Sequence, residues 1–537
     1  MIVTNQEIRL LEREAERLVL EAGAYKTVEL CIEQNYAREG RPRGLSAKAL
    51  FVGCQLLSFA GDYFLRDVPK VLNGLSADLK KRLGLSSAKP VTSRQVTYLV
   101  SRIDAALRAD FDKDHLLEAE RYKNFDEVFS SIARSGAHEE SNNSTSISVD
   151  GTDITTWATD KNIHAQFVDP TTGEVGWAKT RKVTDSDAGY RGSKDVDGKA
   201  SLFGYELTVA VSVKDVNGPD VPRTTLAARF RPVAKSDPRD AALASITEVA
   251  MRRGALGDVL VDRGYTQSKH GRDFLTPVRR LGGEPVFDLK ENQVGVSHSV
   301  RGAVVIDGRP YSPSIPTRFR NIARPSSAGT GVYMPSPLEI KKYEEAIAAR
   351  EVYSLVPHGK IRENGTMAFQ CPGAAGKLIC PLQAPFSKAQ VGAMPASKPP
   401  KKARPNTVCD SRYRSFDIAS ELPLYQRDVF GSTAWRKSYG RRGTSVEPHF
   451  GGLKDEASAA YRRGKVRVRG IIKTGLLVAF ALATTNRRLA LSWEARKAHA
   501  ASAPVKRRKE RERFHHKLTR IEVRGPLLTL GPDPFTS

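Results

Sequence analysis

The sequence predicts an α/β protein in which a mixed β-sheet is flanked by helices. Between residues 145 and 300, short runs rich in β-branched residues alternate with helical patterns, as such a sheet requires. Residues 1–135 show mainly helical patterns, and residues 426–500 return to helices after a Pro- and Gly-rich segment at 301–425. A chain of 537 residues is long enough for about three domains. We expect these parts to be followed by a basic tail at 501–537.

The N-terminal part continues after a leucine-rich first helix with a strongly apolar helix at 47–59. Thr92 and Gln95 form a capping box that predicts the start of a further helix. Its apolar stripe consists of Val96, Leu99, Val100 and Ile103. The opposite face carries Arg94 and Arg102 among Ser, Thr and Tyr side chains, which suits either a DNA major groove or ordinary solvent exposure. We expect a helical DNA-binding region with these two arginines as DNA contacts.

The central part shows its elements in a definite order. A strand that ends at Asp150 is followed by a loop to about residue 200. The remaining elements are strands at 205–213 and 224–233, a helix from about 239 to 253, a strand at 258–262, a helix at 269–282 and a strand at 284–289. This succession is that of a ribonuclease H-like mixed sheet, in which the ends of the first and fourth strands are neighbours.

Residues 301–425 break this pattern, and we interpret them as an insertion into the core. They contain one clear helix at 338–356 and a segment at 397–405, rich in Lys and Pro, that predicts an exposed linker. The core resumes at about residue 426 and ends with a long helix at about 468–498. The expected order of parts is therefore helical region, core, insertion, core and tail.

Three acidic residues point to the chemistry. Asp150 in SISVDGT and Asp262 in DVLVDRGY each end a short apolar run, and Glu447 opens a helical stretch. Strand alternation puts Ile147 and Val149 on one face and Asp150 on the other. Carboxylates placed in this way can hold two Mg²⁺ or Mn²⁺ ions, and such a pair can activate an attacking oxygen and stabilise the leaving oxygen at a phosphodiester.

Each of these acids also has a plainer interpretation. An Asp that precedes Gly is common in turns, and Asp153 is a rival to Asp150 as the first metal ligand. Glu447 could merely complete a capping box with Thr444 by binding its backbone N–H. The joint placement of Asp150, Asp262 and Glu447 favours the catalytic interpretation, with a supporting role for Asp153.

The residues around Glu447 resemble a known signature. Tyr439, Arg442, Glu447 and Lys454 follow one another in the order of the Tyr-x2-Arg-x3-Glu-x6-Lys motif. This motif belongs to DDE transposases of bacterial insertion sequences, in the branch that cuts through a DNA hairpin. The resemblance covers residues 147–489 and implies a ribonuclease H-like core and two divalent metals. It also implies a homodimer on the terminal inverted repeats, with Tyr439, Arg442 and Lys454 on DNA phosphates.

The chain departs from the motif in one place, because four residues instead of three separate Arg442 from Glu447. On one continuous helix, Tyr439 and Arg442 would then turn away from Glu447 by about 80° and 140°. Lys454 stays on the face of Glu447 in either case. We therefore expect a helix break or bulge at Gly443.

The charge balance suits a partner that carries phosphates. The chain has 85 Lys and Arg against 60 Asp and Glu, a net charge of +25. From Gly431 to Gly470, ten basic residues stand against three acids. We expect Arg462 and Arg463, with Lys465, Arg467 and Arg469, to contribute to a DNA channel.

Compartment and cysteine usage fit a cytoplasmic bacterial protein associated with the nucleoid. The N-terminus does not resemble a signal peptide, and the longest apolar run, Gly475 to Ala483, is too short to span a bilayer. The five cysteines do not suggest a disulfide framework. Cys371, Cys380 and Cys409, with His358 as a further candidate, could form a zinc site, but their wide spacing favours unpaired buried thiols.

Three functions compete. The leading one is a transposase that excises and inserts a mobile element. The second is a metal-dependent nuclease of the same fold without strand transfer, which needs only the carboxylates. The third is a DNA-binding derivative that has lost catalysis. Tyr439, Arg442 and Lys454 favour the first.

Overall fold

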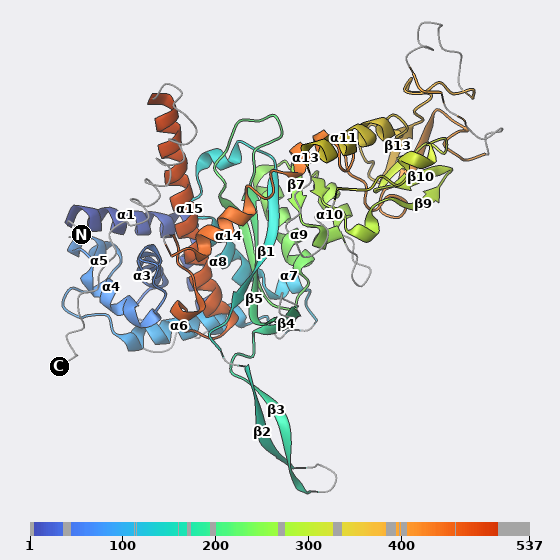
Figure 1. Cartoon of the computed structure of the whole chain (residues 1–537). Helices are drawn as coiled ribbons and strands as arrows, with labels where there is room; N and C mark the ends of the chain where they lie inside the picture. Colours follow the sequence, from blue (N-terminus) through green and yellow to red (C-terminus); the bar gives the residue numbers. More distant parts are fainter. Residues whose placement is uncertain are drawn as a thin grey trace.

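The computed structural model of the chain describes residues 5–502 apart from 36–43, 112, 114, 159, 169–172, 194–199, 267–273, 326–335, 383–393, 397, 399–404 and 457. Within these residues, a central mixed sheet lies between a group of helices on one side and a smaller, separate lobe on the other (Figure 1). The prediction of a mixed sheet flanked by helices is confirmed.

Helices precede the first strand. They are α1 (Asn5–Ala22), α2 (Ala24–Asn35), α3 (Ala47–Phe59), α4 (Val68–Gly74), α5 (Ala77–Arg82), α6 (Ser93–Arg108), α7 (Glu118–Arg121) and α8 (Lys123–Arg134), with short 3₁₀ turns η1 (Leu65–Asp67) and η2 (Glu139–Asn142). They pack around the long helix α15 (Ile471–Ser502), which returns from the far end of the sequence (Figure 1). Apolar side chains of α3, α8 and α15 share one buried cluster.

Helix α6 forms as its sequence predicts. Thr92 and Gln95 make both hydrogen bonds of the capping box. The stripe of Val96, Leu99, Val100 and Ile103 is buried. Arg94 lies on the exposed face, and Arg102 donates a hydrogen bond to the Tyr98 hydroxyl at 3.0 Å and also lies over its ring.

The central sheet has the strand order β4-β5-β1-β7-β8, with β6 paired to β5. Its strands are β1 (Ile147–Thr155), β4 (Gly189–Ser193), β5 (Ala200–Ser212), β6 (Thr225–Pro232), β7 (Asp258–Val261) and β8 (Glu284–Phe287). Strand β1 pairs antiparallel with β5 and parallel with β7, so the first strand and the DVLV strand are neighbours, as predicted. Helices α9 (Pro238–Arg253) and α10 (Leu275–Arg280) pack against one face, and α8 and α15 against the other.

Helix α9 shows how local chemistry sets the boundaries. Asp237 caps its first turn by accepting from the Arg239 backbone N–H at 3.0 Å, and Pro238 occupies the position where its missing N–H costs nothing. The helix ends at Gly254, which adopts φ = 70°. The predicted helix at 269–282 is seen only as α10, and residues 267–273 lie outside the described part of the chain.

The prediction of a loop between Asp150 and residue 200 is wrong. Strand β1 continues to Thr155, and β2 (Asp160–Val168) and β3 (Val175–Val183) then form a hairpin that projects from the sheet (Figure 1). Trp177, in this hairpin, is 68% exposed. The polar and charged composition of the segment hid its strand pattern, because the sequence shows no apolar alternation there.

The outer edge of β6 is closed by side chains. The outward carbonyls of Leu226, Ala228 and Phe230 accept hydrogen bonds from Arg252, Arg229 and Arg231 at 2.7, 2.8 and 3.1 Å. The Ala228 N–H donates to the Ser130 hydroxyl at 3.1 Å. These contacts occupy hydrogen-bonding groups that an edge strand otherwise leaves unpaired.

The predicted insertion forms the smaller lobe (Figure 1). It contains two three-stranded sheets, one of β9 (Val296–Val300), β10 (Ala303–Ile306) and β11 (Arg309–Tyr311), and one of β12 (Val356–His358), β13 (Thr366–Gln370) and β14 (Tyr413–Asp417). Helix α11 (Pro337–Glu351) ends before the predicted 356, because the Leu355 N–H bonds to the Pro310 carbonyl. The predicted linker at 397–405 lies almost wholly outside the described residues.

Among the residues that the structure describes, no helix has both the length and the apolarity needed to cross a membrane. Even α15, with 32 residues, carries charged side chains along its second half.

Candidate carboxylate site

Asp150 and Asp262 lie on neighbouring strands at the same level. The parallel register joins Ile147 with Val259 and Ser148 with Leu260, so two residues further on Asp150 comes beside Asp262. Asp262 directly follows the end of β7, as predicted. Asp150 instead lies within β1, because pairing with β5 carries the strand on to Thr155.

Glu447 comes to the same level of the sheet from the chain segment that follows the insertion. Helix α13 (Thr433–Tyr439) ends before the turn at 440–445, and α14 (Val446–Lys454) begins with Glu447 as its second residue. The predicted break between Tyr439 and Glu447 is confirmed. The N-cap of α14 is Ser445 rather than Thr444, and its side chain caps no backbone N–H.

Arg442 connects the carboxylates. Its Nη2 lies 2.6 Å from Asp150 Oδ2, and its Nη1 lies 3.8 Å from Glu447 Oε1. Burial raises the pKa of Asp150 above its ordinary value, because the opposing effect of Arg442 is smaller, and the nearby charges of Asp262 and Glu447 raise it further. The two aspartates, Glu447 and Arg442 therefore form one electrostatically coupled group.

The neighbouring Arg441, which precedes Arg442 in the same turn, points into the protein instead. Its guanidinium is buried and forms an ion pair with buried Asp258. It also donates to the Lys214 carbonyl at 2.8 Å and to the Ser438 carbonyl at 2.9 Å. The turn thus has one arginine that points into the protein and one that points to the carboxylates.

Tyr439 and Lys454 complete the group. The Tyr439 ring stacks on Trp435 with centroids 5.0 Å apart, and burial raises the pKa of its hydroxyl to about 12 although Arg442 lies nearby. Lys454 Nζ donates to the Thr152 hydroxyl at 2.8 Å, two residues along β1 from Asp150. All four residues of the Tyr-Arg-Glu-Lys motif therefore lie near the Asp150–Thr152 part of β1.

Two further residues near Asp150 were missed from the sequence, and one of them, Glu206, lies directly across from Asp153 and shares its face of the sheet rather than that of Asp150. Glu206 of β5 lies close to Gly151, and its pKa is raised by burial and, among smaller effects, by the charge of Asp150. Tyr265, in the DRGY run, is buried beside Asp150, and burial raises its hydroxyl pKa well above the ordinary value. A single acid within the apolar run YELTVAVSV was the signal for Glu206.

Asp153, the rival first ligand, has a different role. It forms an ion pair with Arg191 of β4, which also contacts Glu206 at 3.1 Å. On strand β1 it is three residues from Asp150, so its side chain leaves the opposite face of the sheet. The structure gives Asp153 a charge partner away from Arg442.

The predicted DNA contacts differ in their surroundings. Arg462 is exposed and pairs with Glu456 at 2.8 Å. Arg463 donates to the Thr156 carbonyl at 2.9 Å, so this arginine fixes the local chain against β1. Arg94 and Arg102 lie on α6, away from the carboxylates in sequence and on another element.

The carboxylates offer the hard oxygen ligands that Mg²⁺ prefers. Within the described residues, however, no three His, Cys, Asp or Glu side chains are close enough together to hold a metal ion, at this site or at the three insertion cysteines. At the carboxylate site, the Arg442 guanidinium takes the position between Asp150 and Glu447. The chemistry of the donors fits a divalent metal, and the guanidinium supplies the balancing charge.

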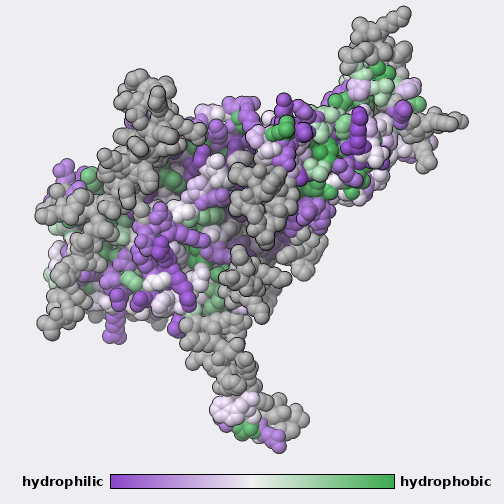
Figure 2. All heavy atoms as spheres, in the orientation of Figure 1, coloured by the Kyte–Doolittle hydropathy of each residue, from purple (hydrophilic) through white to green (hydrophobic). Residues whose placement is uncertain are grey.

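Figure 2 shows mainly hydrophilic side chains over the region where α14 and the lower half of α15 lie in Figure 1. No protein-family model matches this chain, and no curated protein matches it either.

Proposed function

We propose that this chain is a DDE transposase, which cleaves and joins DNA at the ends of an insertion sequence. The observation that carries the proposal is the position of Arg442. It lies in the turn between α13 and α14, and its guanidinium contacts Asp150 and Glu447. Asp262 lies at the same level on the next strand. Three carboxylates around one guanidinium form a charge arrangement that a purely structural strand end does not need.

The fold supports this proposal in its general plan. The strand order and the parallel β1–β7 pair agree with a ribonuclease H-like core, and the helices before β1 would provide a DNA-binding region. The partner is double-stranded DNA, at terminal inverted repeats and at the target, and the working form is a homodimer. The net charge of +25 favours such a partner.

Each side chain has a defined task in this proposal. Asp150, Asp262 and Glu447 would hold two Mg²⁺ or Mn²⁺ ions, which activate a water or 3′-hydroxyl and stabilise the leaving oxygen. The ion pair between Arg442 and Asp150 has to break before the Asp150 carboxylate can bind a metal. The Arg442 guanidinium would then bind a DNA phosphate in place of Asp150, because its planar fork of N–H groups suits that anion. Lys454, beside Thr152 and two residues along β1 from Asp150, would bind a neighbouring phosphate of the same DNA strand.

The test uses a plasmid that carries the coding sequence's own flanking DNA as substrate, with the full-length chain and Mg²⁺. We expect double-strand cleavage at the flanks and joining to a second plasmid. Asp150→Asn, Asp262→Asn and Glu447→Gln should each abolish cleavage and leave DNA binding largely intact, since phosphate contacts elsewhere supply most of the affinity.

Asp153→Asn is the matched control. It removes a carboxylate from the same strand as Asp150, but this carboxylate pairs with Arg191 and not with Arg442. It should keep cleavage. Normal cleavage by any of the three ligand variants would remove that residue from the site. Cleavage without joining would favour the metal-dependent nuclease, and binding without cleavage the inactive DNA-binding derivative.

A further inference from the structure

Four cations follow strand β1 outward from the carboxylate site. Arg442 contacts Asp150, and Lys454 contacts Thr152. Arg463 donates to the Thr156 carbonyl, and the Arg467 guanidinium lies 5.0 Å from the centre of the Trp157 ring. These side chains come from one C-terminal segment, so the order of the cations along β1 follows their order in the sequence.

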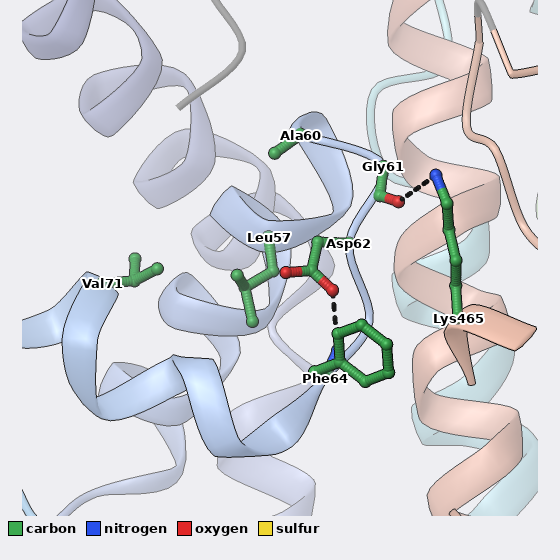
Figure 3. Close-up of a pocket in the computed structure, with 7 residues that line it drawn as sticks. All are labelled: Leu57, Ala60, Gly61, Asp62, Phe64, Val71 and Lys465. Carbon is green, nitrogen blue, oxygen red and sulfur yellow. Dashed lines mark hydrogen bonds between the residues drawn. The ribbon is translucent and has the colours of Figure 1, made fainter. Parts of the chain in front are cut away.

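The outer end of this row meets the helical region. Phe64 lies in the turn between α3 and η1, and its ring is 5.2 Å from the Arg467 guanidinium and 5.0 Å from that of Arg66. Lys465 fixes the two segments together by donating to the Gly61 carbonyl at 3.0 Å, as Figure 3 shows. We call Phe64, Arg66, Trp157, Lys465 and Arg467 the cation–aromatic surface.

The cavity drawn in Figure 3 lies at this junction and has a volume of about 260 Å³. Its lining is mostly apolar, with Leu57, Val71 and the Phe64 ring around the Asp62 carboxylate. Burial raises the pKa of Asp62, and one of its oxygens accepts from the Phe64 backbone N–H at 3.0 Å. The turn that carries Phe64 is thus held by its own local contacts.

The geometry of the stack decides what it can bind. Arg467 lies against both Phe64 and Trp157, so it covers ring faces that would otherwise be open to a stacking base. Cation–π contacts hold the flat face of a guanidinium and leave its edge free to donate. The Nε atoms already have partners, because Arg467 Nε donates to the Gly464 carbonyl at 3.2 Å and Arg66 Nε lies 3.6 Å from Asp67 Oδ2, so the donors offered to an anion are the Nη groups. Arg66 and Arg467 are exposed, and Trp157 is 38% exposed. The surface therefore offers oriented donors to an anion rather than a platform for unpaired bases.

We infer that the cation–aromatic surface binds the phosphodiester backbone of duplex DNA, on the same molecule whose cleaved phosphate lies at Asp150. This inference rests on the proposed function in one respect, namely that the substrate is DNA. It adds contacts from the α3–η1 turn and from the exit of β1, neither of which belongs to the carboxylate site or to α6. Because the contact is to phosphate oxygens, it is independent of base sequence.

The length of β1 places this contact on the DNA. Seven residue steps lead from Asp150 to Trp157, two of them beyond the end of β1 at Thr155, and at ~3.3 Å per residue they span at most about 23 Å. Duplex DNA rises ~3.4 Å per base pair. The surface should therefore touch the backbone roughly seven base pairs from the cleaved phosphate.

The experiment measures binding of full-length protein to a fluorescent duplex from the flanking DNA, with EDTA present so that no cleavage occurs, at salt concentrations from 50 to 200 mM. For Arg467→Ala and Arg66→Ala we expect weaker binding at low salt, and a logarithmic salt slope smaller by about 0.9 for each lost contact. Over that range, each variant should lose about threefold less affinity than the parent. Trp157→Leu keeps every charge, so it should weaken binding and leave the slope unchanged.

Arg13→Ala is the matched control, since Arg13 is an exposed arginine on α1 and the change in charge is the same. Hydroxyl-radical footprinting should show protection about seven base pairs from the cleavage point, and Arg467→Ala should lose this protection while Arg13→Ala keeps it. Parental affinity and salt slope in both Arg467→Ala and Arg66→Ala would overturn the inference, as would equal losses in the control. A parent protein that binds DNA but never cleaves it would contradict the transposase proposal without contradicting this inference. Preference for single strands that depends on Trp157 would contradict the edge-on arrangement.

Discussion

Adjacent arginines in one turn should give opposite phenotypes when each is replaced by alanine. Arg441 and Arg442 are both paired with an aspartate, but their surroundings differ. The side chains of Arg441 and Asp258 are 8% and 6% exposed, whereas those of Arg442 and Asp150 are 14% and 20% exposed. The first pair is buried, and the second is partly exposed to solvent.

The magnitude follows from these contacts. Breaking a buried ion pair from one side costs about 3–5 kcal/mol, because a charge is left without its partner. Asp258 retains Arg427 at 2.9 Å, so Arg441→Ala should lower the free energy of unfolding by about 3 kcal/mol, at the lower end of that range. Arg442→Ala leaves Asp150 partly hydrated and should cost about 1 kcal/mol.

Activity should show the reverse order. A guanidinium that positions a reacting phosphate contributes to the transition state, and loss of one such donor costs about 100-fold in rate. Arg442→Ala should therefore cleave about 100-fold more slowly with nearly unchanged DNA affinity. Arg441→Ala, assayed at a temperature where it remains folded, should retain most of its cleavage rate.

Urea unfolding followed by circular dichroism gives the stabilities, and a gel assay of the flanking-DNA plasmid gives the rates. An Arg441→Ala protein as stable as the parent, or an Arg442→Ala protein as unstable as Arg441→Ala, would contradict this prediction. Normal cleavage by Arg442→Ala would show that this arginine only balances charge.

Three other predictions concern stability and reactivity. Burial alone would raise the pKa of Asp187, but hydrogen bonds from Arg108 and a backbone N–H outweigh it and hold the pKa below its ordinary value. The stability that Asp187 contributes is therefore present above about pH 4 and lost as the pH falls below it. Asp187→Asn should be less stable at pH 7, and its stability in urea unfolding should fall less steeply at acidic pH. An unchanged loss of stability at acidic pH would contradict this. Gly475→Ala would put a Cβ 2.6 Å from the Phe125 ring, so it should cost about 1–3 kcal/mol in urea unfolding, and a variant of parental stability would show that the ring moves freely. Burial raises the pKa of Cys54 to about 12, so a thiol reagent at pH 8 should modify Cys54 only after denaturation, as mass spectrometry of the labelled peptide would show.

The sequence predicted the parts of the fold in which local chemistry and burial agree. The capping box at Thr92, the Asp237-Pro238 start of α9 and the apolar helix at 47–59 all form where their patterns indicate. In each case one face must be buried, so the apolar period reveals the element. The sequence of the β2–β3 hairpin shows no such apolar period, and its pattern therefore predicted a loop.

The candidate site was predictable in its residues and less so in its details. Motif spacing identified Arg442 and Glu447, and it also indicated the helix break between Tyr439 and Glu447. It could not show that Arg441 is buried against Asp258, because that contact joins residues 183 positions apart. Glu206 was missed for the same reason, since only the pairing of β5 with β1 brings it beside Gly151.

The arginines along the outer edge of β6 have a consequence for how copies of this chain can associate. A free strand edge is where two sheets most readily fuse, and Arg229, Arg231 and Arg252 occupy its carbonyls from within the same molecule. To join a second sheet there, the protein would have to break these bonds and displace the buried side chains of Arg229 and Arg231, which Asp126 also holds in place. Assembly on this side is thereby restricted to contacts between side chains, which can form and separate without altering the fold. For the homodimer on DNA that we propose, a sheet edge that cannot pair with the sheet of another copy would keep the association reversible.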